Sequence, residues 1–108
     1  AMLKEKFNAQ GIRYTKNKGH SVHKVAISGG SGSFLLNDAI NADADAFISA
    51  DFKYHNFFDA DGQILIADIG HFESEKVTKE IFHELLTEKF HNFATHLSKI
   101  DTNPINYY

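Results

Sequence analysis

The chain has 108 residues, 43% of them hydrophobic and 13% aromatic, and it contains no cysteine. This composition is typical of one small globular domain or part of one, it excludes a disordered chain, and the lack of cysteine fits a cytoplasmic protein. The formal net charge is −3, with acids and bases interspersed. No basic block therefore indicates a nucleic-acid partner, and the longest apolar runs are too short to cross a bilayer.

The first elements indicate a strand that enters a helix. Leu3–Asn8 has the character of the end of a helix entered midway, so we expect a fragment of a longer protein. The apolar run Lys24–Ser28 predicts a strand that leads into a glycine-rich turn at Gly29–Ser33. Apolar residues then recur at helical spacing, which predicts a helix over Ser33–Ala42, and the Ser33 hydroxyl is a plausible cap for its first turn.

Further along the chain, apolar runs predict strands at Ala46–Ser49 and Gln63–Ile69, separated by a short helix-like stretch near Tyr54–Asp59. The clearest pattern predicts one long amphipathic helix over Glu73–Phe90. Its apolar stripe is formed by Val77, Ile81, Phe82, Leu85 and Leu86. We expect a last strand at Phe93–Ser98, and Asn103-Pro104 stops any helix beyond it.

Strands that alternate with helices predict an α/β fold with a mainly parallel sheet flanked by helices, and with the long helix packed across the sheet. Ligands bind such sheets at the carboxyl ends of the strands. Three polar clusters follow predicted strands: Gly29–Ser33, Asp51–His55 and Gly70–Glu75. We therefore expect these clusters to converge on one edge, with the glycine segment within reach of His71.

His71 and Glu75 are four residues apart at the start of the long helix, a spacing that can bring an imidazole and a carboxylate together as metal ligands. Pairs of this kind also arise by chance on polar surfaces, and an acid near a helix start interacts favourably with the helix dipole. Asp51 and His55 can line the same cleft, or belong to a solvated loop.

The segment Gly29, Gly30, Ser31, Gly32, Ser33 places several amides near a helix start, where phosphate binds. It lacks the Gly-Lys-Ser/Thr of a Walker loop and the spacing of a dinucleotide fingerprint, and a plain strand-to-helix turn is the alternative interpretation. The other histidines form no ligand-spaced group with carboxylates: His20, His23, His83, His91 and His96.

Taken in order, these clusters resemble the carboxy-terminal part of the Nif-three-like family, also called domain of unknown function thirty-four, whose bacterial members often carry the name GTP cyclohydrolase I type 2 homologue. The resemblance covers the chain from about Lys24 to its end. Its four segments are Val25–Ser33 (VAISGGSGS), Ala44–His55 (ADAFISADFKYH), Ala67–Glu75 (ADIGHFESE) and Asp101–Pro104 (DTNP). The family usually has Thr-Gly where this chain has Ser49-Ala50, so the loop at Asp51 can differ slightly.

The resemblance implies the carboxy-terminal part of a Nif-three-like fold over residues 24–108, preceded by a segment, residues 1–23, that follows a missing upstream part. It implies a centre of two divalent metal ions in which His71 and Glu75 are ligands, while Asp51 and His55 line the cleft. The family's remaining ligands belong to its first half and have no counterpart here. This chain alone is therefore expected to hold little or no metal and to be inactive.

For the full-length protein, the resemblance implies a metal-dependent hydrolase acting on a nucleotide or another phosphorylated small molecule. The implied partners are the missing amino-terminal half, further copies in a homo-oligomer, and a small-molecule substrate. A non-catalytic metal- or nucleotide-binding regulatory or assembly module is the competing hypothesis. A self-contained phosphate-binding module that uses Gly29–Ser33 is the third.

Overall fold

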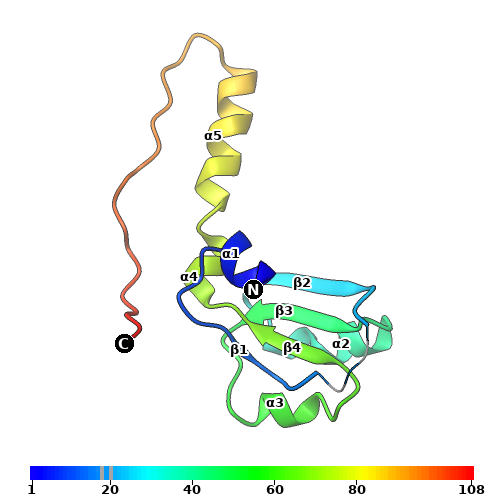
Figure 1. The fold of residues 1–108 in the computed structure, drawn as a ribbon. Helices are drawn as coiled ribbons and strands as arrows, with labels where there is room; N and C mark the ends of the chain where they lie inside the picture. Colours follow the sequence, from blue (N-terminus) through cyan, green and yellow to red (C-terminus); the bar gives the residue numbers. More distant parts are fainter. Residues whose placement is uncertain (18, 20) are drawn as a thin grey trace.

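The computed structural model describes residues 1–17, 19 and 21–108. They form a mixed α/β structure whose four-stranded sheet has the order β1-β4-β3-β2 (Figure 1). The strands are β1 (Arg13–Tyr14), β2 (Val25–Ser31), β3 (Ala46–Ala50) and β4 (Leu65–Asp68). The last three strands are parallel, and the two-residue β1 pairs with β4 in the antiparallel direction. The predicted mainly parallel sheet is confirmed.

Strand β3 is central, and all five of its residues are buried. Phe47 and Ile66 face one side of the sheet, where α2 (Leu36–Asn41) and α3 (Asn56–Asp59) complete the core. Ile48 and Ala67 face the other side, against residues of α1 (Met2–Lys6) and the chain that follows it. Near-continuous apolar strands suit a sheet covered on both faces, and the strand at Gln63–Ile69 was predicted on that basis.

The glycine-rich segment is not the tight turn expected from the sequence. Strand β2 continues through Ser31, and a short 3-10 helix, η1 (Ser33–Leu35), precedes α2. Ser33 lies inside η1, the cap position belongs to Gly32, and no side chain bonds there, so the predicted Ser33 cap is wrong. The register between β2 and β3 is irregular after Ile27, which lets the extra residues extend the strand.

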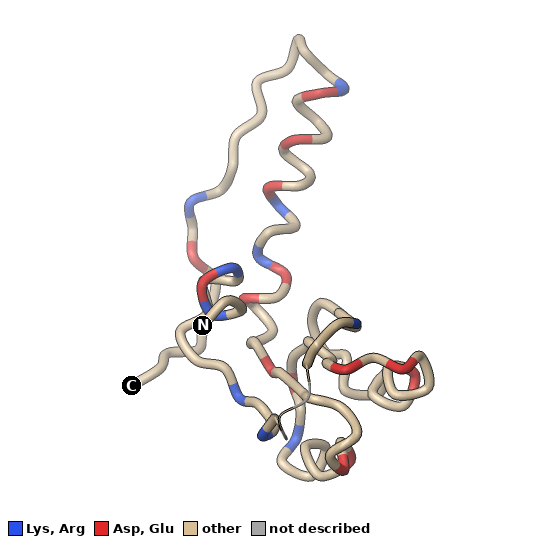
Figure 2. The backbone as a smooth tube through the Cα atoms, turned by 45° about the vertical axis from the view of Figure 1, so that its right-hand side comes forward, with Lys and Arg blue, Asp and Glu red and all other residues tan. Residues whose placement is uncertain are grey.

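The long helix predicted at Glu73–Phe90 is divided into α4 (His71–Glu75) and α5 (Thr78–Lys89). Helix α4 packs on β2 and β3, whereas α5 projects away from the sheet (Figure 1). The apolar stripe of α5 is solvent-exposed, so the predicted packing of this helix across the sheet is wrong. A break at Lys76 and Val77 separates α4 from α5, so α5 leaves the sheet, on which Val25 and Ile27 stay exposed. Three glutamates, Glu80, Glu84 and Glu88, lie along α5 between Lys79 near its start and Lys89 at its end (Figure 2).

Residues 93–98 do not form the predicted strand but belong to an irregular segment that runs back alongside α5 (Figure 1). Lys79 Nζ donates to the Ser98 carbonyl at 2.9 Å, and the hydroxyls of Thr87 and Thr95 are 2.9 Å apart. The segment therefore contacts a helix and has no sheet edge beside it. No helix in the described part of the chain combines the length and apolar character needed to cross a membrane.

Near its end, the irregular segment returns to the core. The Tyr107 ring lies 3.3 Å from the position that a Cβ on Gly11 would occupy, and its hydroxyl lies 3.5 Å from the corresponding position at Gly70. Burial, with smaller contributions from the charges of Glu73 and Asp68, raises the pKa of Tyr107. The carboxy-terminal residues are thus fastened beside the start of α4.

Candidate metal site

The candidate site begins with the residue that lets the chain turn from β4 into α4. Gly70 has φ 91° and ψ 142°, a conformation that other residues rarely adopt. A Cβ at this position would lie 2.2 Å from Oε2 of Glu73, so the buried Glu73 carboxylate occupies the space above the glycine. The turn makes His71 the first residue of α4, at the carboxyl edge of the parallel strands.

The His71 imidazole lies between two carboxylates. Its Nδ1 is 2.6 Å from Oδ2 of Asp51, which follows β3 with φ 58°. Its Nε2 is 3.2 Å from Oε2 of Glu75, one helical turn later. The His71 and Glu75 side chains are 46% and 53% exposed, so the group is open to solvent. The structure therefore brings together three of the predicted residues, from two different strand ends.

The two carboxylates raise the pKa of His71 above its usual value of 6.5. The hydrogen bond that Nδ1 donates to Asp51 is the largest cause, and the charges of Asp51 and Glu75 add to it, against a partial loss of hydration that lowers the pKa. Because a carboxylate can only accept, Nδ1 carries a proton and Asp51 fixes the orientation of the ring. Nε2, which faces Glu75, is then the ring nitrogen whose partner can change.

Gly29–Ser33 lies beside this group, as expected. The Gly30 amide donates to Oγ of Ser74 at 2.8 Å, and a Cβ on Gly30 would lie 3.3 Å from Nε2 of His71. The Gly30 amide is thus already hydrogen-bonded within the protein, and this contact gives no indication of an open anion-binding loop. The proposed binding of phosphate by Gly29, Gly30, Ser31, Gly32 and Ser33 stays a prediction.

His55 has a different environment from Asp51. It precedes α3, and its ring makes an edge contact with Tyr54 at a centroid distance of 5.4 Å. The structure thus joins Asp51 to His71 but gives His55 an aromatic neighbour, and its role in lining the cleft stays a prediction. His20 lies outside the described residues.

Sequence reasoning missed the residues that support the site. Asp68 is buried, accepts from the amides of Phe52 and Gly70 at 3.1 Å each, and forms an ion pair with Arg13. Its carboxylate therefore ties the chain after β3 to the turn before α4. An acid within an apolar run was the available signal, because a buried carboxylate needs several partners.

A cleft of about 550 Å³ opens beside the site, between the α4–α5 junction and the returning chain. His71 and Glu75 line one side of it, and Asn103 and Pro104 line the other. A small molecule in this cleft would be next to the imidazole and the carboxylate. The structure thus also brings Asn103-Pro104, part of the fourth quoted segment, to the same place.

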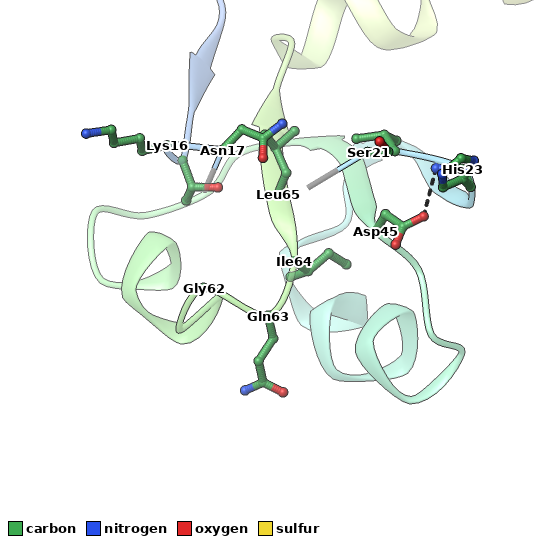
Figure 3. Close-up of a pocket in the computed structure, with 11 residues that line it drawn as sticks. Lys16, Asn17, Ser21, His23, Asp45, Gly62, Gln63, Ile64 and Leu65 are labelled. Carbon is green, nitrogen blue, oxygen red and sulfur yellow. Dashed lines mark hydrogen bonds between the residues drawn. The ribbon is translucent and has the colours of Figure 1, made fainter. Parts of the chain in front are cut away.

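A second cavity, of about 590 Å³, lies at the opposite edge, where the parallel strands begin (Figure 3). Asp45, just before β3, accepts from the amides of His23 and Lys24 there, each at 2.8 Å. The side chains of Lys16 and Gln63 point away from the other lining residues in Figure 3. This cavity is separate from the His71 group.

The described residues contain no group of three or more His, Asp or Glu side chains arranged to hold one metal ion. Asp51 and Glu75 contact opposite nitrogens of the His71 ring, so the three side chains do not converge on a single point. Among the described residues, His71 and Glu75 remain the predicted ligand pair, and their role as ligands stays a prediction.

A family model described as Duf34/NIF3 (NGG1p interacting factor 3) matches residues 1–104 of the chain. A "GTP cyclohydrolase 1 type 2 homolog" of Staphylococcus epidermidis is 38% identical over 96% of this chain and 30% of that protein. A protein of the same name from Campylobacter jejuni is 34% identical over 98% of this chain and 42% of its own length. The chain thus spans less than half of these relatives.

Solved structures show the same fold. Staphylococcus aureus protein SA1388 superposes with a TM-score of 0.81 at 27% identity, over 97% of this chain and 36% of that one. A Bacillus cereus protein related to NIF3 gives a TM-score of 0.76 at 28% identity, over 97% of this chain and 30% of that one. A match over 97% of this chain includes the sheet and most of the irregular segment that follows α5.

Proposed function

This chain belongs to the Duf34/NIF3 family, and from that premise we propose that His71 and Glu75 are two ligands of a two-metal hydrolytic centre. One observation carries the proposal. Nε2 of His71 faces a Glu75 oxygen at 3.2 Å, while Asp51 holds the other ring nitrogen. The imidazole and carboxylate donors are of the kind that Zn²⁺ and other divalent transition metals take in proteins.

The distance between the two donor atoms fits a shared metal ion. Two ligands about 2.1 Å from one ion are about 3.0–3.4 Å apart at octahedral or tetrahedral angles. The Nε2–Oε2 separation of 3.2 Å falls within this range. A neutral imidazole would direct the lone pair of Nε2 at a carboxylate oxygen, so a cation between them, either a proton or a metal ion, would make this contact favourable.

Asp51 would orient the metal ligand without being one. A ligating histidine commonly donates its other N–H to a carboxylate, which fixes the tautomer and makes the ligating nitrogen more basic. The 2.6 Å contact between Asp51 and Nδ1 of His71 supports this role. Substitution of Asp51 would therefore weaken metal binding through His71.

When bound, a pair of metal ions supplies a water of lowered pKa and a clamp for the attacked phosphate. The cleft beside His71 and Glu75 gives a phosphorylated small molecule access to that position. The relatives named GTP cyclohydrolase 1 type 2 homolog support a nucleotide as the class of substrate. The proposed reaction is hydrolysis of a nucleotide or another phosphorylated small molecule.

The remaining ligands would come from an upstream part of a longer protein. This chain offers one His–Glu pair and covers 30% to 42% of its curated relatives. A catalytic two-metal centre needs more ligands from protein than that. We place the missing ligands in the amino-terminal half, and expect the longer protein to form a homo-oligomer.

The test is turnover by the longer protein after chelation and reloading with Zn²⁺ or Mn²⁺. We expect the metal-loaded protein to hydrolyse at least one compound in a panel of nucleotides and sugar phosphates. His71→Ala should abolish this activity, whereas His83→Ala, a histidine on the projecting α5, should retain it. A fully loaded protein that turns over no compound would support the non-catalytic binding module instead.

A further inference from the structure

Strand β2 carries an irregularity directly beside the candidate metal ligands. Ile27 of β2 pairs with Ile48 of β3, and the next pair is Ser31 with Ala50, so β2 has more residues than β3 between these two pairs. Gly30 lies within this irregular stretch, is buried, and has φ 62°. Bulges of this kind often occur next to functional sites, where they redirect one peptide of the strand.

The backbone N–H and the backbone carbonyl of Gly30 are each hydrogen-bonded to a serine from another element. The Gly30 amide donates to Oγ of Ser74 at 2.8 Å, and the Gly30 carbonyl accepts from Oγ of the fully buried Ser49 at 3.2 Å. The Ser74 hydroxyl in turn donates to the His71 carbonyl at 2.8 Å. One hydroxyl therefore connects the strand to the first residue of α4.

Gly30 also leaves room for the ligand pair. A Cβ on Gly30 would lie 2.4 Å from Oε1 of Glu75 and 3.3 Å from Nε2 of His71. The carboxylate thus lies where any other residue would place its side chain. Gly29, one residue earlier, has no such constraint, because a Cβ there would meet its nearest atoms at 3.8 Å.

The support matters because α4 has only five residues. A helix of one turn is unstable without tertiary contacts, and metal affinity depends on how closely the ligands are held. The hydroxyls of Ser49 and Ser74 bond to the Gly30 backbone, and the Ser74 hydroxyl also bonds to the His71 carbonyl. Their common effect is to hold the start of α4 against β2.

We propose that Gly30, Ser49 and Ser74 form a positioning clamp that sets the geometry of His71 and Glu75 for metal binding. Ser74 and Gly30 act through the two ligands and do not touch the metal. The inference rests on the proposed metal site, and it gives the glycine segment a role other than holding phosphate.

The experiment measures the dissociation constant for Zn²⁺ by chelator competition in the longer protein. We expect Ser74→Ala and Gly30→Ala each to weaken Zn²⁺ binding by about 10-fold or more, the size seen when partners of metal ligands are removed. Ser74→Thr keeps the hydroxyl and should stay within about twofold of the parent, by the same reasoning. Gly29→Ala is the matched control for Gly30→Ala and should likewise leave binding unchanged.

Thermal unfolding of the metal-free variants separates positioning from folding. A clamp predicts that Zn²⁺ affinity falls more than metal-free stability does, and that Thr at position 74 restores it. If Ser74→Ala and Gly30→Ala lower metal-free stability but keep parental affinity, while His71→Ala loses it, the clamp is wrong and the metal site stands. If His71→Ala also keeps parental affinity, the proposed function is wrong and the clamp with it.

Discussion

Asp51 and His71 meet at the carboxyl edge of the sheet, with Oδ2 of Asp51 2.6 Å from Nδ1 of His71. Each residue follows the end of a parallel strand, and β3 and β4 are direct neighbours. Asp51 reaches this position with φ 58°, and His71 reaches it through the unusual backbone of Gly70. The positive φ values at Asp51 and Gly70 thus direct the Asp51 carboxylate and the His71 imidazole toward each other.

The first prediction concerns the charge of His71 in the metal-free chain. Its pKa should lie above 6.5, chiefly because of Asp51. Asp51→Asn should bring the value down, because the neutral amide cannot stabilise an imidazolium as a carboxylate does. Titration of the ring protons by NMR measures both values. An unchanged pKa in Asp51→Asn would show that the contact is absent in solution.

The same shift makes stability depend on pH. A pKa raised in the folded state means that the folded chain binds the proton more tightly, so the contribution is complete below about 6.5. It is lost as pH rises through the folded pKa. His71 is about half exposed, so water screens the effect and we expect a small slope in the unfolding midpoint. His71→Ala should remove that slope.

The second prediction is that Gly70→Ala is strongly destabilising. An alanine would need a backbone conformation that costs on the order of 1–3 kcal/mol, and its Cβ would lie 2.2 Å from the Glu73 carboxylate. We expect a total loss of about 2–4 kcal/mol, measured by urea unfolding. Gly19→Ala is the control, since Gly19 has φ 90° with nothing near its Cβ position. Equal losses in the two variants would mean that the Glu73 contact contributes nothing.

The third prediction concerns the buried Asp68. Arg13→Ala leaves this carboxylate with two amide donors and without its ion pair to Arg13. Because the Arg13 side chain is 60% exposed, water can replace part of the lost contact, and we expect a cost of about 1–3 kcal/mol. Lys16→Ala, which removes another cation three residues further along the chain, should change stability by less than about 0.5 kcal/mol. If Arg13→Ala and Lys16→Ala lower the free energy of unfolding equally, the ion pair between Arg13 and Asp68 does not support the site.

The fourth prediction is that α5 is locally unstable. Its stripe residues are exposed, from 37% at Val77 to 60% at Phe82, and an isolated helix of this length is marginal in water. Amide hydrogen exchange should be fast along α5 and slow in the buried β3. Comparable protection in both elements would indicate that α5 is covered in solution.

Strands β3 and β4 could be predicted because burial on both faces selects continuous apolar runs. Strand β2 is more exposed, and its short apolar run before the glycines indicated it. Strand β1 could not, since Arg13 and Tyr14 are too few to form a pattern. The packing of α5 was also wrong. Amphipathic periodicity predicts a helix with an apolar face, but it does not show what covers that face.

The site could be predicted in part for a related reason. Parallel strands place their carboxyl ends together, and this alone predicts that Gly30, Asp51 and His71 approach one another. The contacts themselves depend on backbone conformations at Asp51 and Gly70 and on the Ser74 hydroxyl. No spacing rule gives those. The four-residue spacing made His71 and Glu75 possible metal ligands, and the resemblance favoured that interpretation over a polar surface pair.

The last prediction is that this chain alone binds divalent metal weakly or not at all, although His71 and Glu75 are essential in the longer protein. Two ligands leave most of the coordination shell to water, and a proton on Nε2 would satisfy the Glu75 contact without a metal. Calorimetry with Zn²⁺ should therefore show little heat for the chain. In the longer protein, His71→Ala and Glu75→Ala should each lower metal content, measured by elemental analysis, without unfolding the domain. Tight stoichiometric binding by the chain alone would mean that further ligands are present, with Asp51 and His55 the first to test. Full metal content in both alanine variants would mean that His71 and Glu75 are not metal ligands and only belong to the start of the helix.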